Sequence, residues 1–432
     1  MEKFVITGGN PLKGEFNVRG SKNAASKMMV ASLLTDEPCA IENVPLSVET
    51  DITRELCEHV GSKVQIERAS HICSITTKDI SNARALQLSR KNRIPILAFG
   101  PLLHRKGVAE LPVLGGCPIG HRPINFHIEG LKKMGAYIQR RGHSYYASAK
   151  ELHGAQIKLP YPSVGATENI ILAATLAKGK TLIHNGATEP EIINLIEMLR
   201  VMGAKITVDE EARIIEIDGV KKLHGAKINV MPDRNEVVSI ASAALATSGN
   251  VFVPGVKEDY VATFLAKLTE IGAHYEVSNN GIRFWGKIPY KATTIETAPH
   301  PGFMTDWQQP FAVVLAQAKG TSFIHETVYE DRLNYLKSLE QMGARIQLHT
   351  DCANQPCRFA NKGFVHSATI EGPNNLHGQE LIMPDVRAGM ALIIAALAAR
   401  GTSTLTGVEH IERGYEAIDE RLSLLGADIK RM

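Results

Sequence analysis

The hydrophobic pattern of the chain repeats along its length. Six stretches place apolar residues three or four positions apart, as on one buried face of a helix, and each stretch runs into a glycine followed by a strand-like segment. Successive glycines are 74, 68, 69, 71 and 83 residues apart, at Gly61, Gly135, Gly203, Gly272, Gly343 and Gly426. The pattern predicts six copies of one unit, in which a helix ends at a left-handed glycine and a strand follows.

Two further patterns complete the predicted unit. Ala-rich apolar runs followed by strand-like segments occupy residues 172–185, 241–253, 312–325 and 393–405, and alternating segments open several units, as at 152–159 and 223–230. Each unit therefore has the order strand, helix, strand, helix, glycine, strand, and the fold class is mixed α/β. A repeat array of this kind also describes a binding scaffold without catalytic chemistry.

Length, composition and charge narrow the class of protein. A chain of 432 residues is long for a single core, so we expect about two domains. Its 44% hydrophobic and 22% charged residues exclude a disordered or collagenous chain. Lys+Arg 48 against Asp+Glu 45 leaves a net charge of +3, which argues against a nucleic-acid partner.

The apolar segments argue against a membrane protein. The longest strongly apolar run, residues 390–399, is about half as long as a membrane span. The first residues, MEKFVITGGN, contain no apolar core of a secretory signal. We therefore expect a soluble cytoplasmic protein without membrane insertion.

The cysteines do not form a recognisable metal motif. Six are scattered along the chain, and free thiols are the default in a protein of this size. Cys352 and Cys357 enclose four residues, with no Cys-x-x-Cys and no His-x-x-x-His pair to accompany them. The chain also lacks GxGxxG, P-loop, HExxH and EF-hand patterns. We therefore expect no metal and no cofactor.

Charged residues collect where a predicted strand passes into a helix. Backbone N–H groups and the helix dipole favour anions at such positions. Taken singly, each residue also suits a solvated surface charge or a helix cap. If these ends of the units face one cleft, several cations surround the ligand, and guanidinium groups bind phosphate and carboxylate in bidentate fashion. The sequence thus predicts a polyanionic ligand held by Lys22, Arg93, Arg122, Arg332, Arg387 and Arg413.

Two further residues are candidates for catalysis. Cys117 lies in LPVLGGCPIGHRP, whose glycines and prolines prevent a helix and indicate a mobile loop over a site. Its thiol can donate a proton or, beside Arg122, act as a nucleophile, whereas the ordinary interpretation is a small buried hydrophobe. Asp306 in PHPGFMTDWQQP opens a predicted helix, so it is either an N-cap or a general base facing an alcohol.

At these residues the chain resembles the enolpyruvyl transferases from end to end. The resemblance rests on several motifs in register: GSKNAA around Lys22, GGCPIGHRP around Cys117, SVGAT from Ser163, EPEI from Glu189, APHPGFMTDWQ around Asp306, ETVYEDR to Arg332, PDVRAG around Asp385 and ERGYE around Arg413. It implies two domains of three units each, both inverted α/β barrels (α/β prisms) with helices inside. The domains would comprise residues 22–230, with the Cys117 loop, and residues 1–21 plus 231–432.

The resemblance also implies the chemistry, and the Cys117 loop favours the branch of the family that uses a nucleotide sugar. The enolpyruvyl group of phosphoenolpyruvate would pass to the 3'-hydroxyl of UDP-N-acetylglucosamine with release of phosphate, the first committed step of peptidoglycan synthesis. Cys117 would protonate the methylene carbon and would be the thiol that fosfomycin alkylates, while Asp306 would take the hydroxyl proton. The phosphate and carboxylate would be held by Lys22, Arg93, Arg122, Arg387 and Arg413.

The remaining contacts implied by the resemblance involve both halves of the chain. The nucleotide sugar would contact Asn23, Ser163, Val164, Gly165, Asp306 and Val328. Arg332 and Asp385 would complete the inner shell of residues around the substrates. Glu189 and Glu191 would lie behind this shell. We expect a monomer with open and closed domain states. Two alternatives stay open: transfer to another acceptor alcohol, such as a different nucleotide or shikimate 3-phosphate, and a non-catalytic paralogue that only binds nucleotide sugars. Residues 347–366 are extra loop and explain the longest glycine spacing.

Overall fold

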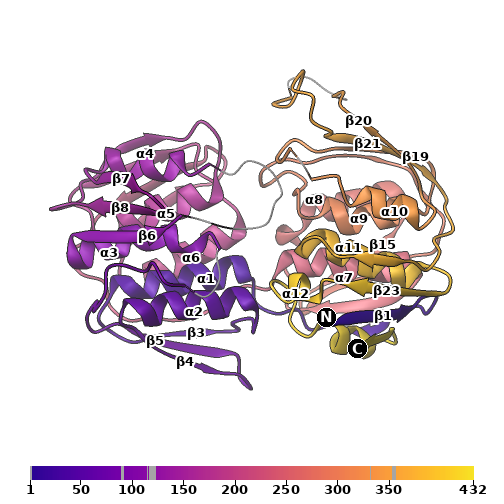
Figure 1. Cartoon of the computed structure of the whole chain (residues 1–432), viewed down its shortest axis with the longest axis horizontal. Helices are drawn as coiled ribbons and strands as arrows, with labels where there is room; N and C mark the ends of the chain where they lie inside the picture. Colours follow the sequence, from indigo (N-terminus) through magenta and orange to yellow (C-terminus); the bar gives the residue numbers. More distant parts are fainter. Residues whose placement is uncertain (1, 89–91, 114, 116–122, 331, 353–356) are drawn as a thin grey trace. The chain divides into compact units, whose positions relative to one another are not determined.

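The computed structural model describes the chain except residues 1, 89–91, 114, 116–122, 331 and 353–356. The chain divides into two compact units (Figure 1). One contains the described residues of 1–19 and 232–432, and the other contains the described residues between 20 and 231. The boundaries expected from the sequence, at 21/22 and 230/231, lie close to these.

The described part of the unit of residues 20–231 contains three sheets. In two of these sheets one edge strand pairs in parallel with its neighbour, and all other pairs are antiparallel. The third sheet has antiparallel pairs only. Their strand orders are β13 (Lys227–Asn229), β3 (Cys39–Glu42), β5 (Ile72–Thr76), β4 (Lys63–Glu67); β9 (Gln156–Lys158), β10 (Lys180–His184), β12 (Ile214–Asp218), β11 (Lys205–Asp209); and β6 (Val108–Pro112), β8 (Ser144–Ser148), β7 (Tyr137–Arg141).

The other unit also contains three sheets among its described residues. Their orders are β2 (Lys13–Glu15), β14 (Asn250–Pro254), β16 (Gly281–Trp285), β15 (His274–Ser278); β17 (Tyr290–Lys291), β19 (Ala318–His325), β21 (Ser367–Gly372), β20 (Arg345–His349), with β18 (Thr294–Glu296) also on β19; and β22 (Glu380–Ile382), β23 (Thr402–Thr406), β1 (Lys3–Thr7), β24 (Asp428–Arg431). Strands β1 and β2 thus tie the first residues of the chain to its second half.

The helices of each unit fall between these strands. The unit of residues 20–231 contains α1 (Lys22–Ala31), α2 (Val48–Val60), α3 (Phe99–Lys106), α4 (Asn125–Lys133), α5 (Val164–Ala174) and α6 (Pro190–Val201), with 3-10 turns η1 (Ser32–Leu34) and η2 (Ile94–Ala98). The other contains α7 (Arg234–Ala246), α8 (Ala262–Ile271), α9 (Gln308–Leu315), α10 (Leu336–Gln341), α11 (Val386–Ala398), α12 (Val408–Ile411) and α13 (Ile418–Ser423), with η3 (Glu258–Tyr260).

Helices that are buried on nearly all sides form the core of each unit. Every residue of α7 and α9 is buried, as is every residue of α11 except the last, and these three helices pack against one another (Figure 1). In the other unit α5 packs against α3 and α4. A helix that is apolar all round is stable only in a core, and alanine allows close approach of neighbouring helices. The Ala-rich runs of the sequence are therefore the inner helices.

The glycine caps confirm the predicted repeat. All six glycines lie in the left-handed region, with φ between 76° and 115°. Such a conformation is strained for any residue with a Cβ atom, which explains why glycine recurs there. Among the described residues, five copies of the repeat differ from the prediction because a further strand follows the last predicted one, as β12 follows β11. A short polar turn at residues 210–213 joins these two strands, and the sequence reading took the pair as one strand. In the last copy β24 ends the repeat and pairs with β1 from the start of the chain.

Candidate functional site

A charged cluster lies in the unit of residues 1–19 and 232–432. Asp306 accepts a hydrogen bond from Arg332 Nη2 on one carboxylate oxygen and from Arg387 Nε at 3.2 Å on the other. The side chains of both arginines are at most 5% exposed, whereas that of Asp306 is 23% exposed. An aspartate held by two buried guanidinium groups has fixed oxygen positions, and here its side chain stays partly exposed.

The local sequence explains why these three residues meet. Trp307, next to Asp306, is fully buried, and its indole N–H donates to Asn235 Oδ1 at 3.0 Å, which fixes the turn before α9. Asp385 is the N-cap of α11 and accepts from the backbone N–H groups of Arg387 and Ala388 at 2.8 and 3.1 Å. The cap places Arg387 in the first turn of a buried helix.

Further side chains complete the electrostatics of this cluster. Arg387 Nη1 donates to Tyr415 Oη at 3.0 Å, and Tyr415 Oη lies 2.7 Å from Ser239 Oγ. Burial acts to lower the pKa of Arg332, but the carboxylates of Asp306, Asp385 and Glu326 raise it overall. Burial likewise acts to lower the pKa of Arg387, but neighbouring groups, above all Tyr415 and Asp306, raise this pKa above its ordinary value. Both guanidinium groups are therefore permanent cations in a poorly hydrated setting.

The loop after β19 contributes a buried carboxylate that the sequence analysis missed. Glu326 is fully buried and accepts hydrogen bonds from Thr305 Oγ1 at 2.8 Å and from the backbone N–H groups of Val328 and Tyr329 at 2.7 and 3.0 Å. Burial raises the pKa of Glu326. Its bonds fix the backbone of Val328, which was predicted to contact the nucleotide sugar, and connect that segment to the turn that carries Asp306.

A second group of predicted residues lies in the unit of residues 20–231, at the start of α5. Ser163 is the N-cap, Val164 and Gly165 form the first turn, and no acidic side chain lies in that turn. A Cβ atom on Gly165 would lie 3.2 Å from the ring of His127, so the glycine lets the ring approach the helix start. Exposed N–H groups at a helix start favour an anionic or carbonyl ligand.

His127 is a neutral hydrogen-bonding group in this second region. Burial lowers its pKa to about 3, and the charge of Arg93 adds to the effect, which places the predicted phosphate ligand Arg93 near this ring. Asn169 Nδ2 donates to His127 Nδ1 at 3.2 Å, so the neutral ring has its proton on Nε2. No signal in the sequence distinguished His127 from an ordinary helix residue.

Buried carboxylates lie in the same unit. Glu168 is 1% exposed, its two oxygens have no hydrogen-bond partner among the described residues, and Lys27 Nζ is 4.0 Å away. Glu189 and Glu191, predicted to lie behind the inner shell, are also buried. Burial, aided by these two charges and opposed by Lys27, raises the pKa of Glu168 to about 7. Glu168 and Lys27 were not predicted, because both occupy ordinary helix positions.

Three other predicted residues lie at a helix start or in a turn. Lys22 and Asn23 begin α1 and are half-buried, and Arg413 is half-buried in the turn after α12. Cys117 and Arg122 lie outside the described residues. The structure thus brings together Asp306, Arg332, Asp385 and Arg387 in one unit.

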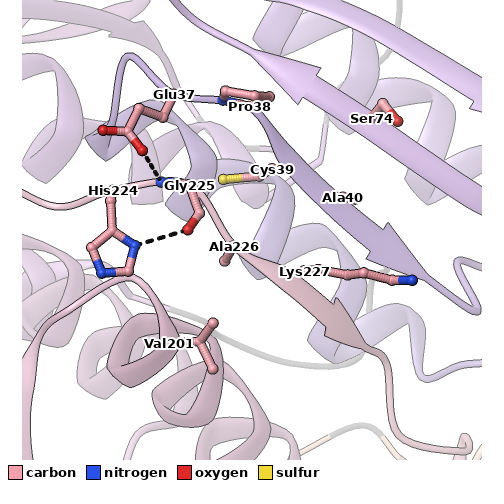
Figure 2. Close-up of a pocket in the computed structure, with 10 residues that line it drawn as sticks. All are labelled: Glu37, Pro38, Cys39, Ala40, Ser74, Val201, His224, Gly225, Ala226 and Lys227. Carbon is pink, nitrogen blue, oxygen red and sulfur yellow. Dashed lines mark hydrogen bonds between the residues drawn. The ribbon is translucent and has the colours of Figure 1, made fainter.

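A surface pocket of about 540 Å³ lies elsewhere, at the starts of the paired strands β3 and β13 (Figure 2). In it Glu37 accepts from the backbone N–H of Gly225 at 3.0 Å, beside Cys39 and Lys227. It contains none of the predicted site residues. Among the described residues, no helix is long and apolar enough to cross a membrane.

Comparisons with known proteins identify the family. The sequence model of the protein family described as EPSP synthase (3-phosphoshikimate 1-carboxyvinyltransferase) matches residues 6–422 of this chain. The chain is 46% identical to a UDP-N-acetylglucosamine 1-carboxyvinyltransferase of Protochlamydia amoebophila, over 99% of this chain and 94% of the relative, and 45% identical to the protein of the same name from Chlamydia abortus, over 99% and 98%.

Solved structures agree on the fold. The enolpyruvyl transferase NikO from Streptomyces tendae superimposes with a TM-score of 0.87 at 24% identity, covering 100% of this chain and 99% of NikO. EPSP synthase from Acinetobacter baumannii superimposes with a TM-score of 0.76 at 20% identity over the whole of both chains. With a family model that spans nearly its whole length and relatives of similar length, this chain belongs to the EPSP synthase family of enolpyruvyl transferases.

Proposed function

We propose that the chain transfers the enolpyruvyl group of phosphoenolpyruvate to the 3'-hydroxyl of UDP-N-acetylglucosamine and releases phosphate. The observation that carries the proposal is the full-length identity of 46% and 45% to two transferases named for this acceptor. The Asp306 cluster supports it, because it combines a partly open carboxylate with two buried cations. From the resemblance and the sequence pattern we further propose that the protein acts in the cytoplasm, as a monomer, in the first committed step of peptidoglycan synthesis.

The reaction adds a proton to the methylene carbon of phosphoenolpyruvate and later removes a proton from the same carbon. Protonation of the methylene carbon of phosphoenolpyruvate makes C2 electrophilic, and the sugar hydroxyl oxygen then bonds to C2 while its proton passes to a base. The tetrahedral ketal loses phosphate by cleavage of the C2–O bond, and the methyl carbon returns the proton it gained. We propose Cys117 as the acid, from its place in GGCPIGHRP, and Asp306 as the base.

The cations would stabilise the charges that develop in the ketal. Phosphoenolpyruvate has a phosphate and a carboxylate, which suit the guanidinium forks of Arg93, Arg122, Arg387 and Arg413 and the ammonium of Lys22. Since Arg332 and Arg387 already bind Asp306, their positions are fixed before the substrate arrives. Such preorganisation lowers the cost of stabilising a transition state.

The nucleotide sugar would lie along the segments around Asn23, Ser163, Val164, Gly165 and Val328. The start of α5 offers N–H groups without an acidic neighbour, and the Glu326 bonds hold the backbone of Val328 in place. We further propose that the two units are the two inverted α/β barrel domains, of three repeats each, expected from the resemblance. The order of strands within the sheets of four or more strands, and the burial of α7, α9 and α11, support this assignment.

The test is phosphate release with phosphoenolpyruvate and a panel of acceptors. We expect release with UDP-N-acetylglucosamine and little with another nucleotide sugar or with shikimate 3-phosphate. Cys117→Ser should lose fosfomycin labelling and most turnover but still bind the nucleotide sugar, and Cys73→Ser serves as the control for a buried cysteine. Release with a different acceptor only would contradict the proposal, and ligand-dependent melting without any turnover would indicate a binding paralogue.

A further inference from the structure

Four side chains of types that can ligate a metal meet beside the sheet formed by β19, β20 and β21. Figure 1 labels the three strands. His325 ends β19, His366 directly precedes β21, and Cys352 and Cys357 lie between β20 and β21. One potential ligand atom from each lies within 4.8 Å of the others. No metal was expected here from the sequence, because one histidine ends β19, the other precedes β21, and the four residues form no compact motif.

The sheet register explains how the two histidines come together. β19 and β21 are antiparallel, and His325 pairs with Ser367, the neighbour of His366. The two imidazole rings are 5.5 Å apart between centroids, and the side chain of His325 and the whole residue His366 are at most 1% exposed. Cys352 Sγ lies 3.1 Å from His366 Nε2. Two strands of a well-packed sheet therefore fix half of the cluster.

Hydrogen bonds orient both rings with Nε2 available as a ligand. His325 Nδ1 donates to Glu296 Oε2 at 2.7 Å, and His366 Nδ1 donates to the carbonyl oxygen of Phe364 at 2.8 Å. A histidine that binds a metal usually donates its other N–H to a carboxylate or a backbone carbonyl in this way. His325 Nε2 is buried and has no hydrogen-bond partner among the described residues. A buried nitrogen without a partner is unfavourable unless something binds it.

The donor set selects the kind of metal. Two sulfurs and two imidazole nitrogens suit zinc, whereas calcium and magnesium prefer oxygen ligands. In a tetrahedral site, metal bonds of about 2.0–2.3 Å place neighbouring donors about 3.3–3.8 Å apart. The largest separation of 4.8 Å therefore closes with a movement of about 1 Å, within reach of loop side chains. Four protein ligands fill the coordination sphere, as in structural rather than catalytic zinc sites.

We propose that His325, Cys352, Cys357 and His366 bind one zinc ion that fastens the loop between β20 and β21 to the end of β19 and the start of β21. The extra loop was expected at residues 347–366, but its first three residues belong to β20. Binding releases the protons of the two thiols, and the ion bonds to two thiolate sulfurs and two neutral imidazoles. The role is structural and independent of the transferase reaction, because the ion has no open position for a substrate.

The first test is the metal content of the protein purified under reducing conditions, measured by mass spectrometry of the elements. We expect one equivalent of zinc in the wild type, and none in the double variant Cys352→Ser/Cys357→Ser. His349→Gln is the matched control, because His349 lies on β20 beside Thr369 rather than in the cluster and should leave the zinc content unchanged.

A second measurement keeps the proposal testable if the double variant does not fold. The metal-stripped, reduced wild type should take up one equivalent of Co²⁺ and develop the visible and near-ultraviolet absorption of a tetrahedral, thiolate-bound cobalt centre. Zinc should displace the cobalt and raise the melting temperature. A wild type that binds neither ion would overturn the proposal, as would a folded double variant that retains zinc, or a Cys352–Cys357 disulfide that persists in reductant.

Discussion

Glu168 offers a quantitative test of the buried charges around α5. Its carboxyl group is 1% exposed, and burial raises its pKa from 4.5 to about 7. The folded chain therefore retains a proton over a pH range in which the unfolded chain has lost it. A group whose pKa is higher in the fold stabilises the fold fully at low pH, and this stabilisation is lost as the pH rises from 4.5 to about 7.

The size of the effect follows from the two pKa values. Each pH unit between 4.5 and about 7 removes about 1.4 kcal/mol, so the total is about 3 kcal/mol. The neutral isostere in Glu168→Gln abolishes the titration but preserves the shape. The stability of the wild type relative to this variant should therefore fall by about 3 kcal/mol as the pH rises through this range.

The assay is urea unfolding of the wild type and of Glu168→Gln at several values between about pH 5 and pH 8. Taking the difference between the two proteins cancels the titration of groups they share. Glu211→Gln, at an exposed position in the turn between β11 and β12, is the control and should follow the wild type at every pH. A difference between the wild type and Glu168→Gln that stays constant within about 1 kcal/mol would refute the reasoning.

Three further changes test other parts of the structure. Asp306→Asn leaves two buried guanidinium groups without their shared carboxylate, so it should lower the free energy of unfolding by about 3 kcal/mol and abolish phosphate release, whereas the exposed Asp259→Asn should do neither. Asp385→Ala removes the N-cap of α11 and should cost about 1 kcal/mol in urea unfolding, most of which Asp385→Asn should restore. Gly203→Ala places a Cβ atom at a φ of 101° and should lower the unfolding free energy by about 1–2 kcal/mol, and an unchanged unfolding midpoint would contradict the left-handed cap.

The features that the sequence predicted are those set by local chemistry. Gly61 and Gly203 marked helix ends because only glycine adopts positive φ without strain. Arg387 was expected where a predicted strand passes into a helix, and it lies in the first turn of α11. Asp385 was expected in the site from the family resemblance, and it caps the same helix. Because these features depend on a few neighbouring residues, one amino-acid sequence is enough to predict them.

The features that the sequence did not predict depend on contacts between distant segments. Glu326 and His127 resemble ordinary residues until the fold surrounds them with donors and apolar groups. The further strand in five of the repeats, as β12 after β11, was missed because a short turn between two polar strand ends gives a weak signal. The cluster of His325, Cys352, Cys357 and His366 became visible only through the register of β19 and β21.

The most direct test of the central claim is the structure of the reaction product. Phosphoenolpyruvate and UDP-N-acetylglucosamine are incubated with the protein, and the product is analysed by mass spectrometry and by NMR of the sugar ring. We predict one enolpyruvyl ether at the 3'-oxygen, formed in a one-to-one ratio with phosphate. Unmodified UDP-N-acetylglucosamine, or an ether at any other oxygen, would contradict the account.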